Sequence, residues 1–206
     1  MTDQAQRKGH LVVPVEVVDL DAMASSIAEF LTAAGLPGAA ASTAPQKTAE
    51  AWAEVLLAGY RQDPATILGQ SWPDQTGELV TMGAVPFVSV CEHHLLPFYG
   101  EAHLAYLPDG HLTGLSRLAA LVDCLARRLQ VQERLTEQLV DVVMDSLQPK
   151  GAACILEAVH DCVGARTLQH RGSRVQTVAY RGDFADNPGL QDRFLRLVLG
   201  GDEVGA

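Results

Sequence analysis

The order of apolar patterns in the last two thirds of the chain is the feature that most constrains its fold. Val-rich stretches bounded by turn residues predict strands, and apolar residues at three- and four-residue spacing predict helices. The expected strands cover residues 78–90, 100–107, 152–161 and 174–181. One expected helix begins after Ser116 as its capping residue, and two further helices are expected at residues 132–147 and 188–199. Two strands, two helices and two strands in succession are typical of an α+β fold, in which an antiparallel sheet is covered on one face.

The first 75 residues have a different pattern, which predicts a separate helical part. After a polar arm, helices are expected at residues 20–36 and 46–60, where apolar residues recur at helical spacing. The following stretch up to residue 75 contains two prolines and is predicted to be a loop. We therefore expect an N-terminal arm and helical part over residues 1–75 and a catalytic domain over residues 76–206.

Composition excludes several classes of partner. The chain has 206 residues with 15 basic and 25 acidic side chains, so its formal net charge is −10. This charge does not favour nucleic acid or anionic membranes, and an anionic ligand must be met by a local basic pocket. No apolar run reaches the ~20 residues that span a bilayer, and the polar N-terminus lacks the apolar core of a signal peptide. We therefore expect a cytoplasmic protein whose four cysteines are reduced.

The densest group of reactive side chains is the sequence Cys-Glu-His-His at residues 91–94. Cys91 and His94 lie three residues apart, so a helical turn places a thiolate and an imidazole on one side. His160 and Cys162 lie two residues apart at the end of a predicted strand, where they would point the same way. Sulfur and imidazole nitrogen together suit zinc. Three ligands, Cys91, His94 and Cys162, leave a fourth position open, as in a catalytic zinc site.

The residues alone leave alternatives open at this position. A closed structural zinc, with His93 or His160 as the fourth ligand, satisfies the same spacing. Ordinary packing of a cysteine beside a histidine, with no metal, is a second alternative. Cys124 and Cys154 lie within the apolar patterns of a helix and a strand, so we expect them to be inert core thiols.

Four segments, in this order, resemble the GTP cyclohydrolase I family. They are Cys-Glu-His-His-Leu-Leu-Pro-Phe-Tyr-Gly at residues 91–100, Gly-Leu-Ser at 114–116, Arg-Arg-Leu-Gln-Val-Gln-Glu-Arg-Leu-Thr at 127–136, and His-Asp-Cys at 160–162 with Arg166 after it. The resemblance is strong over residues 78–184. It implies the tunnelling fold, an antiparallel four-stranded sheet with two helices on one face, and a homo-oligomer of pentameric barrels or decamers with sites at subunit interfaces.

The resemblance also implies a reaction and a role for each matching residue. The family opens the guanine imidazole ring of GTP at C8 by hydrolysis, releases formate and forms 7,8-dihydroneopterin triphosphate, which feeds pterin and tetrahydrofolate biosynthesis. Cys91, His94 and Cys162 would hold the catalytic Zn²⁺, in agreement with the ligand count above. His160 would protonate the purine nitrogen, and His93 would assist later proton transfers.

The remaining matches imply contacts to the guanine nucleotide. Gln132 and Glu133 would hold the guanine edge, because a carboxylate accepts hydrogen bonds from its N1–H and 2-amino groups. Ser116 would contact the ribose or phosphate. Three cationic side chains would contact the triphosphate: Arg166, Arg117 and Lys47.

The chain departs from the family at these phosphate contacts. Where the family has Gly-Leu-Ser-Lys-Leu-Ala-Arg, this chain places Arg117 in the position of the lysine and Ala120 in the position of the last arginine, and Lys47 stands where an arginine is usual. Loss of a charge-assisted hydrogen bond costs on the order of 1.5–3 kcal/mol. Two alternatives to a GTP cyclohydrolase I therefore stay open: a cyclohydrolase for another guanine nucleotide or a modified purine in a specialised pathway, and a non-catalytic zinc-stabilised scaffold.

Overall fold

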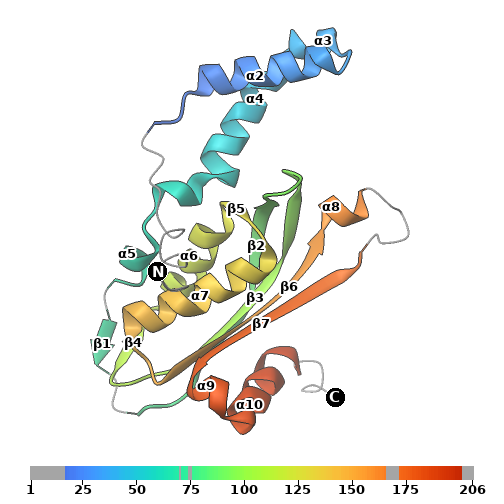
Figure 1. Cartoon of the computed structure of the whole chain (residues 1–206). Helices are drawn as coiled ribbons and strands as arrows, with labels where there is room; N and C mark the ends of the chain where they lie inside the picture. The colour runs from blue at the N-terminus through green and yellow to red at the C-terminus, as the bar shows by residue number, and fades with distance from the viewer. Residues whose placement is uncertain (1–16, 70, 74–75, 166–171, 201–206) are drawn as a thin grey trace, which may run out of the picture. The chain divides into compact units, whose positions relative to one another are not determined.

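The computed structural model describes residues 17–69, 71–73, 76–165 and 172–200 (Figure 1). The chain divides into two compact units, Met1–Gln62 and Asp63–Ala206. The domain boundary predicted at residue 75 lies further along the chain than this division. Among the described residues, no helix combines the length and the apolar character needed to cross a bilayer.

The N-terminal unit is helical. Its elements are α2 (Leu20–Ala33), α3 (Pro37–Ala40), α4 (Ala44–Ala51), the π-helical turn η1 (Trp52–Leu56) and the 3-10 helix η2 (Ala58–Arg61). Asp19 begins α2, because its side chain accepts a hydrogen bond from the amide of Ala22 at 2.9 Å. α2 packs against α4. The single helix predicted at residues 46–60 is instead three short helical segments.

The second unit is built on a five-stranded sheet in the order β5-β2-β3-β6-β7. Its strands are β2 (Val80–Cys91), β3 (Pro97–Leu107), β5 (Leu129–Gln130), β6 (Gly151–His160) and β7 (Arg174–Gly182). β5 runs parallel to β2, and all other neighbours in this sheet are antiparallel. The sheet therefore has one strand more than the four that were expected. The extra strand is β5, a two-residue segment between the two middle helices that pairs with the end of β2.

The region predicted as a loop before residue 75 contains two elements. α5 (Pro64–Leu68) begins after Asp63, whose side chain accepts a hydrogen bond from the Ala65 amide at 3.0 Å. β1 (Ser71–Pro73) then pairs antiparallel with β4 (His111–Thr113) in a separate two-stranded sheet. Proline at the first position of α5 is compatible with a helix start, which explains why counting prolines misled the prediction.

β2 contains the irregularity that its Pro and Gly predict. The register with β3 shifts between Met82 and Val85, and Ala84 has a φ of +54°. The Ala84 amide donates a hydrogen bond to Nδ1 of His103 at 3.1 Å, so the extra residue keeps a partner. Pro86 is tolerated because β5 reaches only the last two residues of β2, which leaves Pro86 on a strand edge.

Helices contact both faces of the large sheet. α6 (Leu115–Ala126) and α7 (Gln132–Leu147) pack on each other and on the sheet. They bury a row of leucines: Leu118, Leu121, Leu125, Leu135 and Leu139. α9 (Asp183–Asp186) and α10 (Pro188–Leu199) follow β7 and also contact the sheet.

The two helix pairs lie on opposite faces. Thr177 of β7 pairs with Leu156 of β6 and hydrogen-bonds Thr136 of α7, so these strand positions face α7. Ile155, the neighbour of Leu156, instead packs in a cluster with Phe194 of α10. Because successive strand residues point to opposite faces, α10 lies on the face away from α7 (Figure 1). The expectation of helices on one face alone is corrected by α10.

Candidate metal centre at the strand ends

The loop after β2 brings Cys91 and His94 together. Cys91 is the last residue of β2, and its carbonyl accepts a hydrogen bond from the Leu95 amide at 2.8 Å, which closes one turn. Leu95 has a φ of +55°, a left-handed conformation that redirects the chain toward β3. The spacing of the predicted turn therefore brings Nδ1 of His94 to 3.8 Å from Sγ of Cys91.

The end of β6 brings Cys162 to the same place. Phe98 at the start of β3 pairs with His160 at the end of β6, so both strand ends lie beside the loop after β2. Helix α8 (Asp161–Gly164) begins directly after His160 and contains Cys162. The prediction that His160 and Cys162 share one strand face is wrong, because Cys162 lies in a helical turn. The side chains are nonetheless close, with Sγ of Cys162 3.9 Å from Nδ1 of His160.

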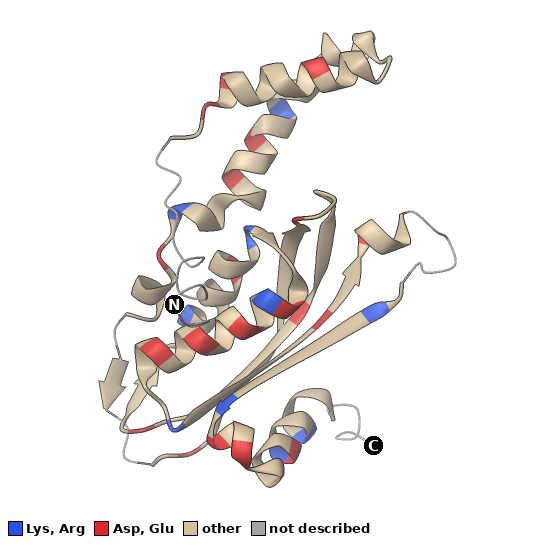
Figure 2. Ribbon diagram, viewed as in Figure 1, with Lys and Arg blue, Asp and Glu red and all other residues tan. Residues whose placement is uncertain are grey.

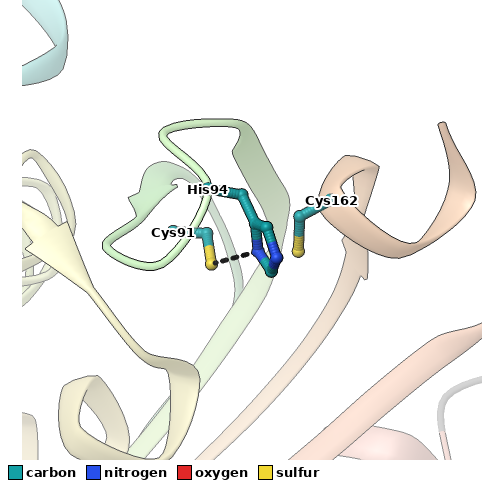
Figure 3. Close-up of side chains that lie close together, drawn as sticks. All are labelled: Cys91, His94 and Cys162. Atoms are coloured by element: carbon teal, nitrogen blue, oxygen red, sulfur yellow. Dashed lines mark hydrogen bonds between the residues drawn. The ribbon is translucent and has the colours of Figure 1, made fainter. Parts of the chain in front are cut away.

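Cys91, His94 and Cys162 form a compact group of possible metal ligands, which we call the Cys-His-Cys centre (Figure 3). One ligand atom of each residue lies within 4.8 Å of the other two. The two cysteines are buried, at 6% and 7% exposure, whereas His94 is exposed to solvent. Figure 3 shows the imidazole of His94 between the two sulfur atoms, so the donors from β2, its loop and α8 converge.

Without a cation, the surroundings of this centre disfavour the thiolate form of Cys162. Burial raises the pKa of the Cys162 thiol, and the neighbouring Cys91 thiol raises that pKa further. A divalent cation between the two sulfur atoms would reverse this effect, because it stabilises the thiolate forms that act as ligands. Two thiols and an imidazole therefore fit a divalent transition metal better than a hard cation such as Mg²⁺.

His160 lies next to the Cys-His-Cys centre and is held on two sides. Its ring stacks on Phe98, with ring centroids 4.7 Å apart and planes 2° apart. Its Nε2 lies 2.7 Å from Oε1 of Gln132. Burial lowers the pKa of His160, and the carboxylate of Glu133 partly opposes this shift. The imidazole is therefore mainly neutral at pH 7 and fixed in orientation.

His93 lies at the rim of the centre. Its Nδ1 is 3.9 Å from Sγ of Cys91, and its side chain is 63% exposed. The preceding residue, Glu92, forms an ion pair with Arg134 of α7 at 2.5 Å, which fastens the loop to the helix. His93 is therefore accessible to a ligand from solvent while its backbone is restrained.

Gln132 and Glu133, the predicted guanine contacts, lie in different surroundings. Glu133 is exposed in the first turn of α7, near enough to His160 to influence its pKa. Gln132 is 1% exposed, and its side-chain nitrogen donates hydrogen bonds to β6 and β7. Both amide hydrogens of Gln132 are thus engaged within the protein.

Ser116 and Arg117 lie far along α6 from the Cys-His-Cys centre. They belong to the first turn of α6, whose 12 residues extend about 18 Å before the chain reaches β5 beside Cys91 (Figure 1). Ser116 is exposed and is not the capping residue, because Gly114 occupies the N-cap without a side-chain bond. Arg117 donates a hydrogen bond from Nη1 to the carbonyl of Ile67 at 2.8 Å.

The two other predicted phosphate contacts have separate positions. Lys47 is exposed on α4 of the N-terminal unit. Arg166 lies outside the described residues. Neither residue is placed at the centre by the described structure, so both assignments stay predictions.

The charged side chains of α7 are mostly acidic or paired. Acidic residues recur at every fourth position along α7, at Glu133, Glu137, Asp141 and Asp145 (Figure 2). Arg134, the cation that follows Glu133, is engaged by Glu92. A phosphate approaching this end of the described unit therefore needs further cations from elsewhere.

Sequence reasoning missed three residues that support the site. Phe98 stacks on His160, and Thr136 and Thr177 hydrogen-bond each other beside Gln132. Thr136 lies four residues after Gln132 on the same helix face, a spacing that was readable in the sequence. Thr177 reaches the site through strand pairing, for which the sequence carries no local signal.

The fold and this centre define an α+β protein with a candidate metal site of two thiols and one imidazole at the strand ends. The family model for GTP cyclohydrolase I matches residues 23–199. Because this match covers most of the chain, the chain belongs to the GTP cyclohydrolase I family.

Curated relatives agree with this membership. GTP cyclohydrolase 1 of Chlorobium phaeovibrioides is 43% identical over 155 residues, which cover 75% of this chain and 69% of that protein. The same enzyme name belongs to a Deinococcus radiodurans protein, 43% identical over 157 residues, 76% of this chain and 72% of that one. A Brucella suis protein of this name is 40% identical over 156 residues, 75% of this chain and 73% of that one.

One solved structure aligns with part of this chain. The crystal structure of the archaeosine synthase QueF-Like in the apo form aligns with a TM-score of 0.44 and 20% sequence identity, and it covers 52% of this chain and 97% of that chain. A similarity of this size is too small to bear on the fold or the activity of this chain.

Proposed function

We propose that this protein is a GTP cyclohydrolase I, which hydrolyses the guanine ring of GTP at C8, releases formate and forms 7,8-dihydroneopterin triphosphate in the cytoplasm. The observation that carries the proposal is the convergence of Cys91, His94 and Cys162 within 4.8 Å beside an oriented His160. Membership of the family and relatives named GTP cyclohydrolase 1 support it.

The proposed metal is Zn²⁺, held by Cys91, His94 and Cys162. A set of two sulfurs and one nitrogen suits zinc, and three protein ligands leave a position open for catalysis. When bound, zinc would act as a Lewis acid and supply a hydroxide nucleophile at neutral pH. Among the described residues, the metal-ligand group contains neither His93 nor His160, which favours the open site over a closed structural one.

The two histidines outside the ligand group are proposed to move protons. His160 is oriented by Phe98 and Gln132, and burial lowers its pKa, so the neutral imidazole first accepts a proton and can then donate it to the purine nitrogen. His93 is exposed at the rim, where it can exchange protons with solvent during the later steps. The buried position of His160 suits a proton transfer during ring opening, and the exposed position of His93 suits the later proton transfers.

Glu133 is proposed to read the guanine. Its carboxylate lies in the first turn of α7 and influences the pKa of His160, so a base bound against it would lie beside His160. A carboxylate accepts hydrogen bonds from N1–H and the 2-amino group of guanine. Adenine lacks this pair of donors, so Glu133 would discriminate between the two purines.

The triphosphate is proposed to be bound with help from a second copy of this chain. Ser116 and Arg117 lie about 18 Å of helix away from the end of α6 that leads to the centre, so one chain does not bring them together. β7 is an edge strand of the described sheet, and an edge strand can pair with another copy. A homo-oligomer, with pentameric barrels or decamers as the proposed form, could therefore complete each site with Ser116 and Arg117 of a neighbour, and Lys47 and Arg166 as further cations.

A second candidate is a cyclohydrolase for a guanine nucleotide with fewer phosphates or a modified purine. It is favoured by Arg117, one N–H group of which already donates to the carbonyl of Ile67, and by Ala120, an exposed uncharged residue on the same helix. The arginine has further N–H groups for a phosphate, so GTP stays the leading substrate. A non-catalytic scaffold is less favoured, because it does not need an oriented His160 beside the ligand group.

The test is turnover by the purified, zinc-loaded full-length protein with GTP, GDP and GMP in parallel. Release of formate and a fluorescent pterin product with GTP as the best substrate supports the leading proposal. A higher kcat/KM with GDP or GMP supports the second candidate. No formate from any of the three, with one zinc bound per chain, contradicts both.

A further inference from the structure

The amide group of Gln132 has an orientation that its partners determine. Its nitrogen lies 3.1 Å from the carbonyl oxygen of Leu156, 2.9 Å from that of Val175 and 3.1 Å from Oγ1 of Thr177. Carbonyl oxygens accept hydrogen bonds and cannot donate them, so the group facing them must be the NH₂. The flipped amide would place its oxygen against two carbonyl oxygens at the same distances. Oε1 of Gln132 must therefore be the atom that faces His160.

Two threonines restrain the same residue. Oγ1 of Thr136 donates to the backbone carbonyl of Gln132 at 2.7 Å. Oγ1 of Thr177 lies 2.6 Å from Oγ1 of Thr136 and, since the Thr136 hydrogen is already used, donates to it. Thr177 in turn accepts from the Gln132 amide. Each donor thus has one consistent direction, and the ring of bonds holds Gln132 from both its side chain and its backbone.

This orientation decides which nitrogen of His160 carries a hydrogen. Nε2 of His160 lies 2.7 Å from Oε1 of Gln132, and an amide oxygen can only accept, so Nε2 carries the hydrogen. Stacking on Phe98 fixes the plane of the ring. The other nitrogen, Nδ1, lies 3.9 Å from Sγ of Cys162 and faces the Cys-His-Cys centre.

We propose that Gln132 is a positioning residue that fixes His160 as the Nε2–H tautomer, with Thr136 and Thr177 as its supports, and that its side chain does not contact the guanine base. The effect on catalysis rests on the proposed function, whereas the tautomer of His160 follows from the hydrogen bonds alone. His160 then meets substrate through Nδ1, and Glu133 alone of the Gln-Glu pair reads the base. The orientation of His160 therefore depends on Gln132, whose NH₂ group is held by two strand carbonyls and by the hydroxyl of Thr177.

The kinetic test compares Thr177→Val with Thr177→Ser in zinc-loaded full-length protein, with formate release from GTP as the assay. Thr177→Val removes the hydroxyl and is expected to lower kcat about tenfold with KM changed less than twofold. Thr177→Ser keeps the hydroxyl and is expected to stay within about threefold of wild type in both constants. Equal kcat in the two variants overturns the supporting role of Thr177, because the carbonyls of Leu156 and Val175 then suffice to orient Gln132.

Gln132→Met tests the second half of the proposal against Glu133→Gln. A positioning residue acts on the chemical step, so Gln132→Met should lower kcat about a hundredfold with little change in KM. Glu133→Gln should raise KM instead. If Gln132→Met raises KM and leaves kcat unchanged, Gln132 contacts the base and the proposal is wrong. Should Gln132→Met not fold, the tautomer of His160 in the wild-type protein still decides the outcome.

A spectroscopic test does not depend on turnover. Protein labelled with ¹⁵N at its histidine rings is measured at pH 8, and His160→Asn identifies the His160 signals. The two-bond ¹H–¹⁵N pattern of wild type should be that of the Nε2–H tautomer, and Thr177→Val should show a mixture of tautomers. An Nδ1–H pattern in wild type contradicts the inference. If wild type releases no formate from GTP yet shows the Nε2–H pattern, the proposed function fails while the placement of His160 stands.

Discussion

The base end and the phosphate end of the proposed substrate site are built in different ways. The base end, which consists of the Cys-His-Cys centre, His160 and Glu133, is assembled within one unit by three strand ends and the start of α7. The residues proposed for the phosphate end are dispersed. Ser116 and Arg117 lie at the far end of α6, Lys47 is in the N-terminal unit, and Arg166 is outside the described residues.

This difference reflects what each kind of contact requires. Metal ligands must converge within a few tenths of an ångström, which adjacent strands in register can provide. Phosphates are met by long cationic side chains, whose reach tolerates contributions from another unit or another copy. The comparison therefore predicts that changes at the base end abolish the chemistry, whereas changes at the phosphate end weaken binding and can be repaired by a neighbouring chain.

The largest effect is expected from Cys162→Ala. Loss of one of two thiolate ligands should remove tight zinc binding and lower formate release more than about a thousandfold. Metal content by plasma mass spectrometry and single-turnover assays measure the two effects. Cys154→Ala is the matched control, because Cys154 is fully buried in β6, where burial raises the pKa of its thiol, and it is expected to keep its zinc. One zinc per chain in Cys162→Ala would show that the ligand assignment is wrong.

Mixed oligomers test whether the phosphate end comes from a second copy. At GTP concentrations well below the wild-type KM, Cys162→Ala chains and Ser116→Ala/Arg117→Gln chains should each release little formate alone. Co-expressed and co-purified through two different tags, they should recover about a quarter of wild-type activity, because random association makes sites with one intact base end and one intact phosphate end. Activity no greater than the sum of the separate variants would place both ends of the site in the same chain.

A smaller effect is expected from Arg117→Lys, which keeps the charge and loses the planar arrangement of donors. The hydrogen bond to Ile67 and a simultaneous phosphate contact need separate N–H groups, which lysine cannot present in the same geometry. KM for GTP should rise about three- to tenfold with kcat within about twofold. A large fall in kcat with unchanged KM would show that α6 acts on the chemistry and would break the comparison.

The smallest expected effect is a pH dependence of the free energy of unfolding, which involves neither the base end nor the phosphate end of the site. Burial lowers the pKa of His103, against the raising effects of Glu101 and Glu157, while the unfolded chain takes up a proton near pH 6.5. The unfolded state therefore binds more protons just below pH 6.5, and stability falls as the pH drops through that value. His103→Asn keeps an acceptor for the Ala84 amide and should flatten this dependence by up to about 1 kcal/mol between pH 7.5 and 6. Urea unfolding of both proteins at the two pH values measures it, and equal slopes would exclude His103 as the source.

Sequence patterns predicted most of the second unit because its elements have strong local signals. The helices at residues 132–147 and 188–199 have the predicted bounds, since both combine apolar periodicity with clear start and stop residues. The failures have physical reasons. β5 is two residues long and is stabilised by pairing with β2, and α10 covers a sheet face whose apolar residues alternate with those of the other face. Neither property has a local sequence pattern.

The candidate site divides in the same way. The sequence by itself determined which residues have metal-binding and acid-base chemistry, because Cys and His types and their spacing depend on covalent structure and local turns. The grouping of Cys162 with Cys91 and His94 was predicted from the sequence. Tertiary structure alone decided that Cys162 lies in a helical turn and that Gln132 bonds His160. These contacts depend on strand register between segments far apart in the chain, and register is set by the packing of the whole sheet rather than by any short segment.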